Sequence, residues 1–190
     1  MRGACRLLQV TVDRLSFVTH FRELTMSAYE LAQLNIGIIK GPMDSPIMAD
    51  FAAGLERINA LADHSPGFVW RLQTAEGDAT SIRPFEDENL LVNMSVWRDV
   101  ESLNKYVYGS AHVELMRRRR EWFERMREAF LVLWWVPAGH RPSIAEAIAK
   151  LEVLRARGPT AEAFTFRQAF PPPDAVQSPS YSFGDECPAT

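Results

Sequence analysis

The sequence predicts an α+β protein of the ferredoxin-like class, and three observations lead to it. Stretches with the two-residue period of a strand and stretches with the helical period follow each other in the order β-α-β-β-α-α-β-α-β. No glycine-rich phosphate loop follows the first strand, which disfavours a dinucleotide-binding fold. A length of 190 residues is typical of one domain. We therefore expect one domain over residues 29–170, with a sheet of about five strands.

The first half of this domain begins with a strand over residues 29–39. Its faces alternate, with Ala32, Leu34, Ile36 and Ile38 on one side and Leu31, Gln33 and Asn35 on the other. Ser45 and Pro46 are typical of a helix start, and an apolar stripe continues that helix to Ala62. Turn and strand signals then predict a turn at 64–67, a strand at 68–74, a polar loop at 75–87 and a strand at 90–97.

The second half begins with two helices. Asp99 caps residues 100–108, and Ser110 caps residues 111–127, where His112 falls on an apolar stripe. Three further elements are predicted: a strand over the wholly apolar residues 130–136, a helix from the capping box at Ser143 to Gly158, and a last strand at 163–170.

The two ends of the chain differ from this pattern. Met26 stands just before the first strand, so we expect the domain to span 28–172 and residues 1–27 to be an extension that is not native. The alternative for the extension is a short helix over 7–21. Residues 173–190 are rich in proline and serine, which predicts a disordered tail.

The composition excludes several classes of function. A net charge of −3 gives no reason to expect nucleic acid or an anionic membrane as a partner. The run Arg117 to Arg120 is flanked by glutamates, which is typical of a solvated helix face. Cys5 and Cys187 have no metal-type spacing and fit a reducing, cytoplasmic location. No zinc spacing, P-loop or Ser-His-Asp order is present, so no metal site is predicted.

A candidate site follows from the strand at 90–97 and the helices after it. Asn93 and Trp97 share one face of that strand, and His112 has an imidazole that acts as a base or a ligand near neutral pH. Asn35 lies on the first strand, where asparagine is disfavoured. Each has a structural alternative: a core histidine bonded to a backbone carbonyl, a packed indole, or an amide that ties down a loop.

Two other groups of residues have both a functional and a structural interpretation. His140 and Arg141 would hold an anionic ligand, or form a rigid corner in which Arg141 pairs with Glu146. Trp134 and Trp135 point to opposite faces of their strand, so one of them faces a second sheet or a partner.

The motifs YELAQLNIG, NMSVW, SAHVELMRRRREWF, LWWVPAGHRPSIAEAIAKL and AFTF together resemble a bacterial and fungal family of domains of unknown function. That family is similar to the dimeric α/β barrel superfamily, which includes the antibiotic biosynthesis monooxygenases. The resemblance covers residues 28–172. It implies a homodimer of two packed sheets, with a cavity between sheet and helices in each protomer.

Neighbouring families imply two chemistries and leave a third reading open. A cofactor-free monooxygenase acting on an aromatic small molecule would use Asn93 and Trp97 to hold the deprotonated substrate and His112 as the base. A haem-binding or haem-degrading protein would use Asn35, Trp97 and His112, with haem as the cofactor. The alternative from a different class is a non-catalytic homodimer that binds a small ligand.

Overall fold

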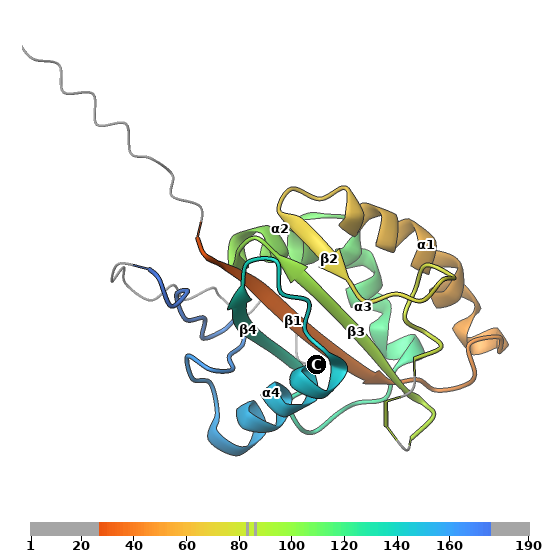
Figure 1. Cartoon of the computed structure of the whole chain (residues 1–190). Helices are drawn as coiled ribbons and strands as arrows, with labels where there is room; N and C mark the ends of the chain where they lie inside the picture. The colour runs from red at the N-terminus through yellow and green to blue at the C-terminus, as the bar shows by residue number, and fades with distance from the viewer. Residues whose placement is uncertain (1–26, 83, 86, 176–190) are drawn as a thin grey trace, which may run out of the picture.

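The computed structural model describes residues 27–175 except 83 and 86 (Figure 1). Three sequence predictions lie outside these residues: those for an extension over 1–26, for Met26 and for the tail after 175. The described elements are β1 (Tyr29–Ile38), a 3-10 helix η1 (Pro46–Met48), α1 (Ala49–Asp63), β2 (Phe68–Arg71), β3 (Leu90–Trp97), α2 (Val100–Gly109), α3 (His112–Trp122), β4 (Leu131–Pro137) and α4 (Ile144–Arg157).

The strands form one antiparallel sheet in the order β2-β3-β1-β4. Each helical crossover therefore skips one strand, which is the split arrangement of the ferredoxin-like class. The α+β class and the order of the first seven elements are confirmed. In the register of β1 and β3, Asn35 lies directly opposite Asn93, and Gln33 lies opposite Ser95.

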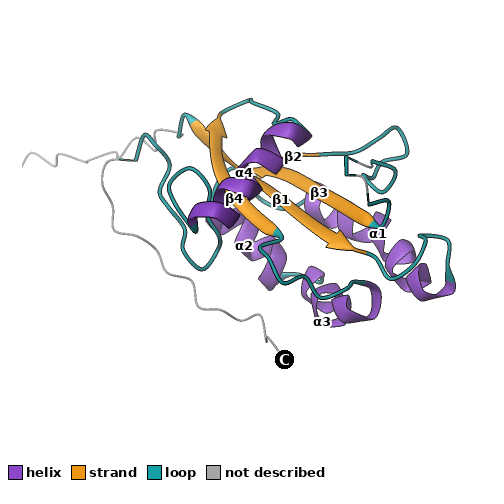
Figure 2. Cartoon of the chain, turned by 90° about the horizontal axis from the view of Figure 1, so that it is seen from below, coloured by secondary structure: helices purple, strands orange, loops and turns teal. Residues whose placement is uncertain are grey.

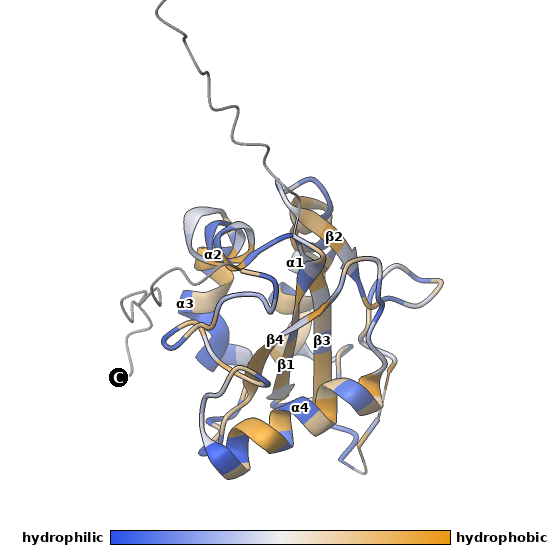
Figure 3. Ribbon diagram, turned by 60° about the vertical axis from the view of Figure 1, so that its left-hand side comes forward, coloured by the Kyte–Doolittle hydropathy of each residue, from blue (hydrophilic) through white to orange (hydrophobic). Residues whose placement is uncertain are grey.

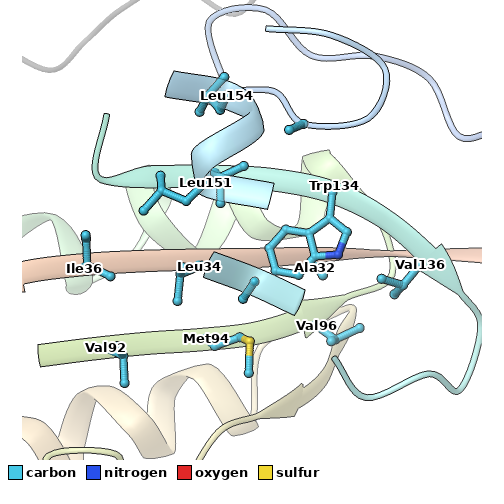
Figure 4. Close-up of a cluster of buried hydrophobic side chains, with 13 residues drawn as sticks. Ala32, Leu34, Ile36, Val92, Met94, Val96, Trp134, Val136, Leu151 and Leu154 are labelled. Carbon is cyan, nitrogen blue, oxygen red and sulfur yellow. The ribbon is translucent and has the colours of Figure 1, made fainter. Parts of the chain in front are cut away.

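Helices cover both faces of this sheet. Figure 2 shows α4 on one side and α1, α2 and α3 on the other. Figure 4 shows the α4 side, where Leu151 and Leu154 pack against an apolar layer from the strands. The strand residues of that layer are Ala32, Leu34, Ile36, Val92, Met94, Val96, Val132, Trp134 and Val136. Figure 3 shows the amphipathic pattern of α4 and the polar surface of α3.

The helix caps follow the sequence in two cases out of four: Ser110 lies one residue before the N-cap of α3, which is Ala111, and Ser45 makes no cap bond. The Ser143 hydroxyl accepts a hydrogen bond from the Glu146 amide (3.1 Å), and the Asp99 carboxylate accepts one from the Ser102 amide (2.7 Å). Ser45 instead donates to the Pro42 carbonyl (2.5 Å) and makes no side-chain cap. The helix after Ser45 accordingly starts as the 3-10 turn η1.

The predicted strand at 163–170 is wrong, and the described sheet has four strands. Phe164 makes an isolated bridge to Leu133, with both N···O distances 2.8 Å, and the pairing stops there. A tight turn between Thr160 and Ala163 precedes the bridge, and further turns follow it. The segment is held by side chains instead: Phe164 is fully buried, and the Trp135 indole donates to the Phe170 carbonyl (2.8 Å).

Two boundaries are also shorter than predicted. The helix expected at 111–127 ends at Trp122, because Phe123 turns extended and bridges Ile39 at the end of β1. The strand expected at 68–74 ends at Arg71. In the predicted tail, Asp174 accepts hydrogen bonds from Ser27 and from the Ala28 amide (2.7 Å), so residue 174 closes against the start of β1.

The wholly apolar β4 needs no second copy to cover it, because α4 covers one face of β4 and the segment around Phe164 covers the other. Among the described residues, the exposed large apolar side chains are Ile47 and Tyr108. The homodimer stays a prediction without support from β4.

Replacing Ser143 with alanine removes the cap of α4 and should lower the free energy of unfolding by about 1 kcal/mol, as measured by urea denaturation. Ser45→Ala is the matched control. It also removes a serine hydroxyl before a helix, but one that makes no cap bond. We expect the control to lose less than half as much, and equal losses would contradict the assignment.

Candidate functional site

A cleft lies between the sheet and helices α1, α2 and α3. It consists of two adjoining cavities of about 170 Å³ and about 200 Å³. The residues that line both cavities come from the sheet and from two helices: Asn35, Asn59, Arg71, Asn93, His112, Met116 and Arg119. Because β1 and β3 alternate, the sheet turns its apolar layer to α4 and its polar side chains to this cleft.

The polar floor of the larger cavity is a connected hydrogen-bond network. The amide nitrogen of Gln33 donates to Asn93 Oδ1 (3.2 Å) and to Ser95 Oγ (3.0 Å) across the β1–β3 pair. The Trp97 indole also donates to Ser95 Oγ (2.8 Å). Gln33, Ser95 and Trp97 are buried, so each of these bonds satisfies a group that burial would otherwise penalise.

This network leaves hydrogen-bond donors for a ligand. Ser95 Oγ accepts two bonds, so its own hydrogen is left to donate. Asn93 uses its oxygen to accept from Gln33, which leaves its NH₂ group, and its side chain is exposed. Within the described part of the chain, the Asn35 amide makes no side-chain hydrogen bond although it lies opposite Asn93. The floor therefore favours a ligand with an oxygen acceptor.

His112 begins α3 above this floor. Its Nδ1 lies 3.3 Å from the Val107 carbonyl, which only accepts, so Nδ1 carries the proton and Nε2 carries the lone pair. Burial lowers the pKa of His112, against the hydrogen bond to Val107 that raises it. The imidazole is therefore neutral at pH 7, and its Nε2 is able to accept a proton.

Tyr106 joins His112 to Trp97. Its ring stacks on Trp97 (centroids 5.0 Å apart, 26° between planes) and contacts the His112 ring (4.9 Å, 43°). Its hydroxyl donates to the Ile58 carbonyl on α1 (3.3 Å). Burial raises the pKa of this hydroxyl far above its usual value, so it stays protonated. Tyr106 is not among the site residues predicted from the sequence, because no spacing rule links a residue of α2 with the first residue of α3.

Arg71 links the lining of the cleft to α1 and to the loop after β2. Its guanidinium donates to both carboxylate oxygens of Asp63 at the end of α1 (2.8 and 3.1 Å) and to the Gly77 carbonyl (2.6 Å). The side chain is 14% exposed. Arg71 thus fixes the loop after β2 to α1 beside the cavities.

The structure brings the four predicted site residues together. Asn35, Asn93, Trp97 and His112 all line the larger cavity, and all but Trp97 line the smaller one. Trp97 meets His112 through the ring of Tyr106. His112 also bonds a backbone carbonyl, as expected for the structural alternative of a core histidine. Its role in chemistry stays a prediction.

The space does not fit a haem. The cleft is divided where Asn35, Asn93 and His112 line both cavities, so neither part, about 170 Å³ or about 200 Å³, offers a single space of even the ~300 Å³ at which pockets for drug-sized ligands begin. Asn35 and His112 are therefore given no haem chemistry.

Among the described residues, no group of three His, Cys, Asp or Glu side chains is placed to hold a metal ion. No helix in that part of the chain is long and apolar enough to span a bilayer.

Of the two roles considered for His140 and Arg141 after β4, an anion site and a rigid corner, their contacts fit the rigid corner. His140 Nε2 lies 2.8 Å from Glu146 Oε2, and the Trp134 indole donates to the other oxygen of that carboxylate (3.1 Å). Arg141 pairs with Glu30 (3.4 Å), so the predicted partner of Arg141 is wrong. The corner ties α4 to the sheet and lines neither cavity.

One comparison with known proteins identifies a family, and none of the comparisons identifies a reaction. The family model described as a domain of unknown function (DUF3291) matches residues 30–180. No curated protein matches the chain.

Solved structures give only distant likenesses. SnoaB, a cofactor-independent oxygenase from Streptomyces nogalater, is 19% identical with a TM-score of 0.40, over 63% of this chain and 100% of that one. NE2512, a protein of unknown function from Nitrosomonas europaea, is 14% identical with a TM-score of 0.39, over 61% and 97%. Rv0793 from Mycobacterium tuberculosis is 14% identical with a TM-score of 0.38, over 60% and 99%.

The pKa of His112, measured by NMR titration of its imidazole signals, should lie below the 6.5 of a free imidazole. Tyr106→Ala uncovers one side of the ring, so the pKa should rise toward 6.5, whereas Tyr106→Phe keeps the ring and should change it little. The His112→Gln variant lacks this imidazole and so identifies which NMR signals belong to His112.

The unfolded chain binds the His112 proton at higher pH than the folded chain, so the free energy of unfolding should fall as pH drops below about 6.5. A wild-type pKa at or above 6.5 would contradict the buried, neutral imidazole.

Proposed function

We propose that this chain, which belongs to the family of domains of unknown function DUF3291, oxidises a small aromatic molecule with dioxygen and without a cofactor. One observation carries the proposal: a neutral imidazole and a floor of hydrogen-bond donors line the same cavity. The motif resemblance to the antibiotic biosynthesis monooxygenases supports the same reaction class.

The reaction begins with a proton transfer. His112 Nε2 takes a proton from an acidic C–H next to a conjugated carbonyl or phenol, which leaves a carbanion whose charge spreads onto the ring oxygen. The donors of Asn93, Asn35 and Ser95 stabilise that oxygen, because they are held in place before the charge develops. The aromatic side chains of Trp97 and Tyr106 offer the ring a flat apolar surface.

Dioxygen is then the oxidant. The carbanion passes one electron to O₂, and the resulting radical and superoxide combine to form a C–O bond. The peroxide loses water as the protonated His112 returns its proton. The ring CH₂ that a phenol carries in its keto tautomer thus becomes C=O, and the second oxygen atom leaves as H₂O. Dioxygen takes up the four electrons that the carbon loses, and no further reductant is needed.

The size of the larger cavity limits the ring system that it accommodates. A cavity of ~150 Å³ binds benzene, so about 200 Å³ suits one or two rings. All of the residues used come from one chain, so the reaction does not require a second copy. A homodimer and a cytoplasmic location, the latter from the cysteine usage alone, remain further proposals.

His112→Ala should lower the rate of oxygen consumption with an accepted phenol or naphthol by about 100-fold or more, because it removes the base. An oxygen electrode measures the rate. His64→Ala is the matched control, since His64 is exposed and also contacts a carbonyl four residues earlier (Ala60, 2.7 Å). The wild-type rate should fall as pH drops through the lowered pKa of His112, because only the neutral ring takes a proton.

Binding of such ligands without oxygen consumption would overturn the proposed reaction and leave the small-ligand-binding alternative. Equal activity of wild type and His112→Ala would remove His112 from the mechanism. A Soret band in the purified protein would reinstate the haem alternative.

A further inference from the structure

The smaller cavity has an apolar wall that the larger cavity lacks. The residues that line it alone include an apolar wall from α1, α3 and the chain after α3, and we call this the apolar chamber: Phe51, Leu55, Ile58, Leu115, Trp122 and Phe123. The larger cavity adds Gln33, Ser95, Trp97 and Tyr106 instead, and we call it the ring chamber. The two chambers meet at Asn35, Asn93 and His112.

The apolar chamber has a rigid wall with few free polar groups. The Phe51 ring packs against Trp122 (centroids 5.6 Å apart) and edge-on against Phe123 (5.1 Å). The polar residues Asp78 and Thr80 also line it, but Asp78 Oδ1 accepts from both the amide (2.8 Å) and the hydroxyl (2.7 Å) of Thr80. The chamber therefore offers a ligand mainly hydrocarbon surface.

Its walls are incompletely buried in the chain alone. Phe51, Leu55 and Leu115 are half-buried, although protein interiors are normally packed without voids of this size. A hydrocarbon group in the chamber would remove their exposed surface from water, which is favourable in proportion to the area covered.

We propose that the substrate has two parts: an oxygen-bearing ring in the ring chamber and a hydrocarbon substituent in the apolar chamber. This inference rests on the proposed function for the identity of the ring. The junction at Asn35, Asn93 and His112 then receives the oxygen and the acidic carbon, which connect the two parts. An unsubstituted phenol fills only half of the site.

The test is a series of 2-alkylphenols from phenol to hexylphenol, whose chain lies beside the oxygen, with Kd measured by calorimetry. Each added methylene should lower Kd by about fourfold until the chamber is full. Leu55→Trp fills the apolar chamber and should abolish this dependence on chain length. Ala53→Trp, at an exposed position of the same helix that lines neither cavity, is the matched control.

The outcomes separate the inference from the proposed function. A Kd that falls with chain length in the wild type and the control but not in Leu55→Trp supports the two-part site, whether or not oxygen is consumed. A flat series in the wild type, or the same dependence in Leu55→Trp, overturns the two-part site even if phenol is oxidised. No binding of any member overturns both.

Discussion

The cleft depends on one hydrogen-bonding residue, Gln33, which reaches from β1 to both Asn93 and Ser95 on β3. These bonds lock a register in which the polar side chains of Gln33, Asn35, Asn93 and Ser95 fall on the face of α1, α2 and α3. A slip of one residue would turn Gln33 and Asn35 into the apolar layer under α4, where no partner exists among the residues of that layer. The same bonds leave the Asn93 amide and the Ser95 hydroxyl turned to the cavity.

The two faces of the sheet differ: one forms a closed apolar core and the other lines the candidate site. The face under α4 is a closed apolar layer, with Trp134 anchored to Glu146 of the helix that covers it. The opposite face combines polar strand residues with helices that bridge over them, so space remains where the side chains cannot all pack. Because α4 is part of the same chain, the apolar face of the sheet does not need a second copy to cover it.

Sequence reasoning succeeded where a local rule determines the structure. Alternation placed Asn35, Asn93 and Trp97 on one face, and the caps at Asp99 and Ser143 located two helix starts. It failed where the outcome depends on distant packing. The all-apolar β4 is compatible with cover from its own chain or from a partner, and Tyr106 acts only through ring contacts that cross from α2 to β3 and α3. The segment around Phe164 had a strand-like composition, but turns on both sides limit it to one bridge.

The central claim is that Asn35, Asn93 and His112 meet one ligand in one cavity. The most direct measurement is an NMR titration with 2-propylphenol that follows the side-chain NH₂ signals of both asparagines and the imidazole of His112. The account predicts that all three shift with the same Kd, while the indole signal of Trp134 under α4 does not move. Shifts confined to the α4 face, or unrelated Kd values for the three groups, would contradict it.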